Sequence, residues 1–383
     1  MFPKIAFTIA CAGFAFGLQG CTAPLALSTP GAGPDGPVVL KNPYAEVNWA
    51  EVNQYLANLH CHTIKSDGRA EPDELIYMYA DAGYSILAIA DHDNYYIARE
   101  GERDPGPTQE TTWPWTRWID EEPARIWTSN GMETSAFYPD LGPGGMLAIR
   151  GNELSTHPHV VSLFNDCGFA DTDHTEDERM ACVKGKGGIA YWAHPSLYVP
   201  PHGWQNLVFD ASMEEALEYF GDYIVRYDSM LGVEFNQNDI DARMPEPVTI
   251  LDALLKAHYR DHDVFVFGSD DSHLTHVADN STLTIVLAED LSEESVRRAL
   301  ENGHTFVGQR TSVFPQFRGI NVDEAAKTIS VDAADYERIT WIKDGEEYHV
   351  GDSVDFSEME DAVLRFEVLA DGTTFYSQAF FID

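Results

Sequence analysis

The stretch YLANLHCHTIKSDG, residues 55–68, decides the fold. It opens with an apolar run that has the length and composition of a buried strand, and this run ends in His60-Cys61-His62. Because side chains alternate along a strand, both imidazoles project from one face and the Cys61 thiol from the other. We therefore expect the two histidines to act together at the strand end, and Cys61 to pack in the core.

Similar apolar runs recur between Tyr55 and Gly308 and alternate with helical stretches, the pattern of α/β units. The expected strands cover residues 55–60, 85–90, 146–152, 160–164, 189–193, 231–235 and 264–268. Helices are expected over residues 72–82, 249–258 and 292–302, and the first of these begins with Pro72 and ends at Gly83.

Residues that can bind metals follow the ends of these strands. They are Asp67, Asp91-His92-Asp93, Glu153, His157, His159, His194, Asp270, Asp271 and His273. Neutral imidazoles and carboxylates suit zinc, manganese or iron, whereas a thiolate site would need more cysteines than this chain has. Strand ends on one rim of a barrel can bring such distant positions together.

Along the chain these motifs follow one another in the order HxH, SDG, DH, Glu, two separated His and DxH. This order resembles that of the PHP (polymerase and histidinol phosphatase) superfamily over roughly residues 55–308. The resemblance implies an α/β fold with a distorted seven-stranded barrel that binds two or three divalent metal ions. An amidohydrolase barrel also begins with HxH, but it lacks the early DH and SDG elements.

Carried over by position, the resemblance implies three metal sites that share ligands. The first site would use His60, His62, Glu153 and Asp271. Glu153 would bridge to a second site, formed with His159 and His194. The third site would be completed by Asp67, His92 and His273. His157 competes with His159, which is favoured because it precedes the apolar strand VVSLF. Asp270 competes with Asp271, and only Asp271 gives the DxH spacing.

Such a centre predicts a hydrolase that acts on a small ester. Clustered metals acidify a water, Asp271 could take its proton with Glu153 as the bridging ligand, and a histidine such as His194 could protonate the leaving group. Phosphoester hydrolysis is favoured by the resemblance. The alternatives are carboxylester or carbamate hydrolysis, as in the carbaryl-hydrolase-like CehA/McbA group, and a non-catalytic metal-binding surface lipoprotein.

Candidate substrate contacts are fewer and less specific. Lys65, Arg69 and Arg310 could bind phosphate, although each could equally be a surface charge. The long segment between Asp93 and Glu153 holds four tryptophans, at positions 113, 115, 118 and 127. They could pack a small core of their own, or form an aromatic lid in which Trp113 and Trp115 contact the substrate.

The amino terminus reads as an export signal. Residues 1–20 contain one charge and an apolar run too short to span a bilayer, and Leu18-Gln19-Gly20-Cys21 resembles a bacterial lipobox with Cys21 as the lipidated residue. Residues 21–44 read as a Pro/Gly-rich tether. We expect an exported, lipid-anchored protein at the outer membrane, facing the periplasm, or at the cell surface. There Cys167 and Cys182 could form a disulfide or remain free thiols.

The tether leads into a PHP domain, residues 45–310, and then into a different pattern. Residues 311–383 alternate like antiparallel strands, with runs at 327–331, 339–343, 362–369 and 375–382. Asp344-Gly345 and Asp371-Gly372 supply hairpin turns. We expect a small C-terminal β-sandwich with a structural role.

The charge of the chain limits its partners. It has 63 acidic residues against 24 lysines and arginines, a formal charge of −39. Nucleic acids and anionic lipids bind mainly through lysine and arginine, so neither is expected to bind by charge. We expect contact with a membrane only through the lipid on Cys21.

Overall fold

The structure, a computed structural model, describes residues 36–93, 112–155, 158–168, 174–199, 212–236 and 247–383. The expected signal peptide, Cys21 and most of the expected tether lie outside these residues. Among the described residues, no helix is both long and apolar enough to cross a bilayer.

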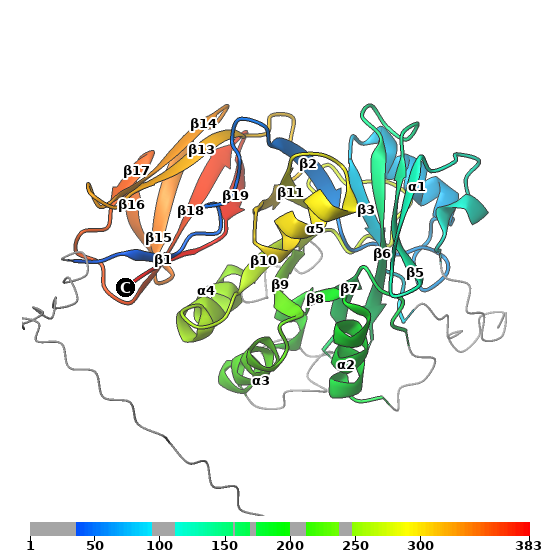
Figure 1. The fold of residues 1–383 in the computed structure, drawn as a ribbon, viewed down its shortest axis with the longest axis horizontal. Helices are drawn as coiled ribbons and strands as arrows, with labels where there is room; N and C mark the ends of the chain where they lie inside the picture. The colour runs from blue at the N-terminus through cyan, green and yellow to red at the C-terminus, as the bar shows by residue number, and fades with distance from the viewer. Residues whose placement is uncertain (1–35, 94–111, 156–157, 169–173, 200–211, 237–246) are drawn as a thin grey trace, which may run out of the picture. The chain divides into compact units, whose positions relative to one another are not determined.

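Seven strands form a continuous run of ladders that carries the metal-binding motifs (Figure 1). In ladder order they are β2 (Asn53–Asn58), β3 (Ile86–Ile89), β6 (Met146–Leu154), β7 (Val160–Leu163), β8 (Ile189–Trp192), β9 (Met230–Asn236) and β10 (Phe265–Ser269). The two ends of the run meet through a parallel bridge between Cys61 and Ser272, where the His62 N–H donates to the Ser272 carbonyl at 2.9 Å.

All seven expected strands are present, and they are apolar because they are buried on both faces. Every residue of β3, β7, β8, β9 and β10 is buried, as in sheets covered on both sides. One feature differs from simple α/β units: β7 runs antiparallel to both of its neighbours. A short apolar run has the same hydrophobic pattern whether the strand is parallel or antiparallel to its neighbours, so the sequence does not reveal this reversal.

Helices flank this run of strands. The three expected helices form as α1 (Pro72–Asp81), α4 (Pro247–His258) and α5 (Glu293–Glu301), and the structure adds α2 (Glu176–Lys186) and α3 (Met213–Arg226). A capping box, in which the Glu71 and Glu74 side chains each accept a backbone N–H, starts α1 directly before Pro72. Figure 1 shows α2, α3 and α4 on the same side of β7, β8 and β9.

The tryptophan-rich segment forms a hairpin and a short helical turn. Strands β4 (Arg125–Ser129) and β5 (Met132–Tyr138) pair across an Asn-Gly turn, and β5 continues the sheet beside β6. In the 3-10 helix η1 (Trp115–Arg117), the Trp115 ring stacks on Tyr138 with the ring centroids 5.5 Å apart. Trp113 and Trp115 are buried in the same hydrophobic core as Tyr138.

The C-terminal strands continue the large sheet. From β2 the order is β11 (Thr282–Ala288), β12 (Thr305–Gln309), β19 (Thr373–Ser377), β18 (Ala362–Ala370), β15 (Arg338–Lys343) and β16 (Glu346–Val350), all antiparallel. A separate sheet holds β13 (Gln316–Asp323), β14 (Thr328–Ala334) and β17 (Ser353–Asp355). Both expected Asp-Gly hairpin turns are present, and both of their residues have positive φ.

Two details differ from the sequence analysis. The run expected over residues 375–382 divides into β19 and β20 (Phe380–Ile382), and the buried residue Gln378 lies at the break between them. Its amide donates to the Val266 carbonyl at 2.8 Å and accepts from the Val266 N–H at 2.9 Å, in the way a strand partner would. Within the expected tether, β1 (Val39–Lys41) pairs with β20.

Two of the described cysteines form a disulfide. Cys167 and Cys182 are joined in a disulfide, which ties α2 to the loop that follows β7. Cys61 is free and fully buried, as expected for a packing residue.

Candidate metal centre

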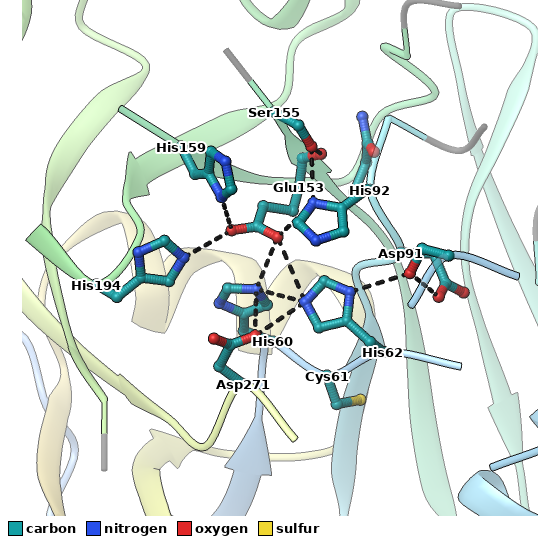
Figure 2. Close-up of polar contacts among 12 residues, drawn as sticks. His60, Cys61, His62, Asp91, His92, Glu153, Ser155, His159, His194 and Asp271 are labelled. Carbon is teal, nitrogen blue, oxygen red and sulfur yellow. Dashed lines mark hydrogen bonds and ion pairs between the residues drawn. The ribbon is translucent and has the colours of Figure 1, made fainter. Parts of the chain in front are cut away.

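Four side chains converge on one point: one comes from β6, and the others come from the segments that directly follow β2 and β10 (Figure 2). These are His60, His62, Glu153 and Asp271, here called the inner set. The Asp271 Oδ1 atom lies 2.9 Å from His62 Nε2 and 3.3 Å from His60 Nε2. Two imidazole nitrogens and two carboxylate oxygens at this spacing form a donor set that can hold a divalent metal ion.

Glu153 faces a second group of histidines with its other oxygen. Glu153 Oε1 lies 2.8 Å from His159 Nδ1 and 2.9 Å from His194 Nε2, and these three residues are here called the second set. Glu153 Oε2 points instead toward His60 and His62, at 3.4 and 3.3 Å from their Nε2 atoms. One carboxylate therefore lies between two groups of imidazoles (Figure 2).

Asp67, His92 and His273 form an outer set. Asp67 Oδ1 lies 3.0 Å from His273 Nε2 and 3.4 Å from His92 Nε2. His62 also belongs to this group by distance, but its Nδ1 lies 3.2 Å from the Ser66 hydroxyl while its Nε2 faces the inner set. Since a neutral imidazole has only one lone pair for a metal, His62 serves the inner set.

The three sets differ in their exposure to solvent. The side chains of His273, His92 and Asp67 are 33, 24 and 21% exposed, whereas those of His60 and Glu153 are fully buried. Among the described residues, the outer set is therefore the most exposed of the three.

The environment of Glu153 Oε2 tests whether the site fits a cation. This oxygen is buried and receives no hydrogen bond among the described residues, although three imidazole nitrogens lie within 3.4 Å of it. A buried carboxylate oxygen normally accepts hydrogen bonds, because losing its hydration is costly. Burial alone would raise the pKa of Glu153, but the charges of His92, His159 and His60 outweigh it and lower that pKa well below its usual value. A cation among these atoms fits the geometry.

Backbone conformation also marks the site. His194, Asp271 and Asp93, all at or next to predicted ligand positions, have positive φ values of 31°, 46° and 52°. Such values are uncommon for residues other than glycine and concentrate at functional sites.

The structure brings all nine predicted ligands together in these three sets. Of the two competing pairs, His157 lies outside the described residues, whereas His159 contacts Glu153. Asp270 points elsewhere: it accepts hydrogen bonds from Asn58 at 2.7 Å and from Tyr79 at 2.8 Å. Burial outweighs these bonds and raises the pKa of Asp270 to about 6.

The predicted substrate contacts are dispersed. Lys65 Nζ lies 4.5 Å from the centroid of the Trp118 ring, and Arg69 is exposed. Arg310 donates to the Ala82 carbonyl at 3.2 Å. Trp113 and Trp115 are core residues, as described above.

Glu234, a carboxylate in β9, was not among the predicted site residues. Glu234 Oε1 lies 2.9 Å from His60 Nδ1, the ring nitrogen that does not face the inner set. The available signal was a single acidic residue inside an otherwise apolar run.

Comparisons with known proteins add a partial likeness in fold. No protein-family model matches the chain, and no curated protein matches it. A two-domain protein from Bacteroides vulgatus, containing a predicted PHP-like metal-dependent phosphoesterase, aligns with 15% identity over 88% of this chain and 96% of its own, at a TM-score of 0.47. A lesion-specific endonuclease from Pyrococcus furiosus aligns with 12% identity over 65% of this chain and 56% of its own, at 0.40. At these values neither likeness places the chain in a family or assigns it an activity.

Proposed function

We propose that this chain is a metal-dependent hydrolase of the PHP type that cleaves small phosphoesters. The observation that carries the proposal is Glu153, whose two buried oxygens face two different groups of imidazoles. A bridging carboxylate between two metal ions explains this arrangement better than a structural role, because Oε2 receives no hydrogen bond. The proposal includes a seven-stranded barrel and a C-terminal sandwich, which the bridge between Cys61 and Ser272 and the separate β13–β14–β17 sheet support.

Bound divalent ions would supply an acidified water and positive charge for the phosphoryl oxygens. The inner set would hold one ion, the second set another, and the outer set a third. Zinc, manganese and iron all suit these imidazole and carboxylate ligands.

The chain's own residues would orient the substrate and move protons. The outer set is the most exposed, so a phosphoester would enter past His273 and His92. Burial alone would raise the pKa of Asp271, but His60 and His62 lower it below the usual value, which keeps this side chain ionised as a metal ligand must be. Its position between these two imidazoles would also let it take a proton from a water held there.

An anionic substrate is compatible with the acidic surface only at such a centre. The chain carries a net charge of −39, so phosphate is repelled elsewhere. Small substrates are favoured over a nucleic-acid duplex for the same reason.

Export and lipid anchoring at Cys21 are also part of the proposal. The Cys167–Cys182 disulfide supports export, because disulfides persist mainly in oxidising compartments outside the cytosol. Metabolic labelling with a fatty acid, compared with a Cys21→Ser variant, tests the anchor. An equally labelled variant would exclude Cys21 as the lipidated residue.

The activity is tested with residues 22–383 loaded with zinc or manganese. The expected result is two or three metal ions per chain by elemental analysis and turnover of bis-p-nitrophenyl phosphate or its monoester. Glu153→Gln should lose both metal and activity, whereas Glu293→Gln, a buried carboxylate from α5, should keep both. Cleavage of 1-naphthyl carbamates alone would replace the phosphoesterase proposal with the carbamate hydrolase. Bound metal without turnover of any ester would indicate a binding protein.

A further inference from the structure

Glu234 lies in a fully buried strand next to the candidate metal centre. It is fully buried in β9, and every other residue of that strand is also buried. A carboxylate in such a place is costly unless its oxygens are bonded. It is not part of the inner, second or outer set, so metal binding does not account for it.

One oxygen of Glu234 controls the orientation of His60. Glu234 Oε1 lies 2.9 Å from His60 Nδ1, on the side of the ring away from Glu153 and Asp271. With Nδ1–H donating to this carboxylate, the lone pair of His60 is on Nε2 and faces the inner set. A carboxylate behind a ligand histidine fixes both its tautomer and its orientation.

The other oxygen controls the backbone at His194. Glu234 Oε2 accepts the His194 backbone N–H at 2.9 Å. His194 has φ 31° and ψ 55°, a left-handed conformation, and it precedes Pro195, which favours an extended conformation at its neighbour. This hydrogen bond therefore holds an unfavourable turn that directs the imidazole of His194 toward Glu153.

We propose that Glu234 is a positioning residue that couples the two metal sites, through His60 in the inner set and His194 in the second set. This inference rests on the metal centre proposed above. The role requires a carboxylate: both partners are donors, and only a carboxylate accepts with both of its oxygens. A glutamine of the same shape has one acceptor and one NH2 donor, so it must oppose one of the two N–H groups.

Glu234→Gln tests the inference, with Glu293→Gln as the matched control. Glu293 is also buried and also accepts two hydrogen bonds, from the hydroxyls of Thr134 and Ser135. Hydroxyls can donate or accept, so glutamine is tolerated there. In the full-length protein, zinc affinity is measured by competition with a chelator, and the visible spectrum is recorded after cobalt substitution.

Glu234→Gln should weaken zinc binding about 10- to 100-fold and change the cobalt spectrum. Glu293→Gln should match the wild type in both measurements. Unchanged affinity and spectrum in Glu234→Gln would overturn the inference while leaving the metal centre intact. A wild type that binds no zinc or cobalt would overturn the proposed centre itself.

If Glu234→Gln does not fold, the zinc-loaded wild type still decides the question. Its His60 imidazole should show a slowly exchanging Nδ1–H proton by nuclear magnetic resonance, assigned by its loss in His60→Gln. A His60 ring without a proton on Nδ1 would overturn the inference.

Discussion

Arg179 provides a direct test of how the site is supported by the surrounding fold. It lies in α2 with its side chain 1% exposed, and it forms an ion pair with Asp93, whose side chain is 14% exposed. Asp93 follows the predicted ligand His92 and has a positive φ. Arg179→Met removes the charge, keeps most of the side-chain volume and leaves Asp93 buried without its cation.

The expected cost follows from this burial. Removing one partner of a buried ion pair costs about 3–5 kcal/mol, because the remaining charge stays desolvated. Asp93 keeps a contact with the Ser155 backbone N–H, 3.3 Å from its oxygens, so we take the lower value, about 3 kcal/mol. In a chain of this size 1 kcal/mol changes Tm by about 2 °C, which predicts a Tm about 6 °C lower.

Thermal unfolding of the metal-free protein measures this change, and Arg226→Met is the control. Arg226, in α3, also pairs with carboxylates, but its side chain is 39% exposed, and exposed pairs contribute about 1 kcal/mol or less. Its Tm should therefore fall by about 2 °C at most. Equal losses in the two variants, or a loss under about 2 °C in Arg179→Met, would refute the argument from burial.

Three further predictions concern parts of the fold outside the site. Gly232→Ala should abolish soluble folded protein, because an added Cβ would lie 1.9 Å from a backbone oxygen of β10. Gly144→Ala is the control and should express normally, because no atom lies within 4 Å of the added Cβ. Equal yields of the two variants would contradict this prediction. Burial lowers the pKa of His304. The unfolded chain therefore takes up this proton first as the pH falls below about 6.5, and stability decreases there. His304→Gln should lose less Tm than the wild type between about pH 7.5 and pH 5.5, and a parallel loss would disprove this. Replacing Cys167 and Cys182 by serine should cost about 3 kcal/mol for their 15-residue separation, seen as a Tm about 6 °C lower; an unchanged Tm would exclude a stabilising disulfide.

The sequence predicts the strands of the fold better than the way they are connected. Buried strands are continuous apolar runs, so all seven could be located. Strand direction leaves no trace in a run such as VVSL, and the antiparallel β7 was missed for that reason. The pairing of β12 with β19 joins residues far apart in the chain, and no local pattern encodes it.

The strand ends could be predicted to carry metal-binding side chains, because the ends of neighbouring strands lie close together. The choice of nine ligands and their division into three sets came from the resemblance to the PHP superfamily. Glu234 could not be predicted in this way. Its role depends on which side chains lie beside β9 in space, and these come from the ends of β2 and β8. The same holds for Gln378, whose side-chain amide bonds to the backbone of Val266, a residue 112 positions earlier in the chain.

The chemistry of these side chains explains why a carboxylate, and not a histidine, links the inner and second sets. A neutral imidazole has one lone pair and one N–H, so it can serve one metal and one acceptor. A carboxylate has two oxygens, each able to face a different group. Within the centre, Glu153 directs one oxygen toward His60 and the other toward His194. In β9, Glu234 directs its two oxygens to His60 Nδ1 and to the backbone N–H of His194. His60 and His194 therefore each contact both acids, Glu153 and Glu234.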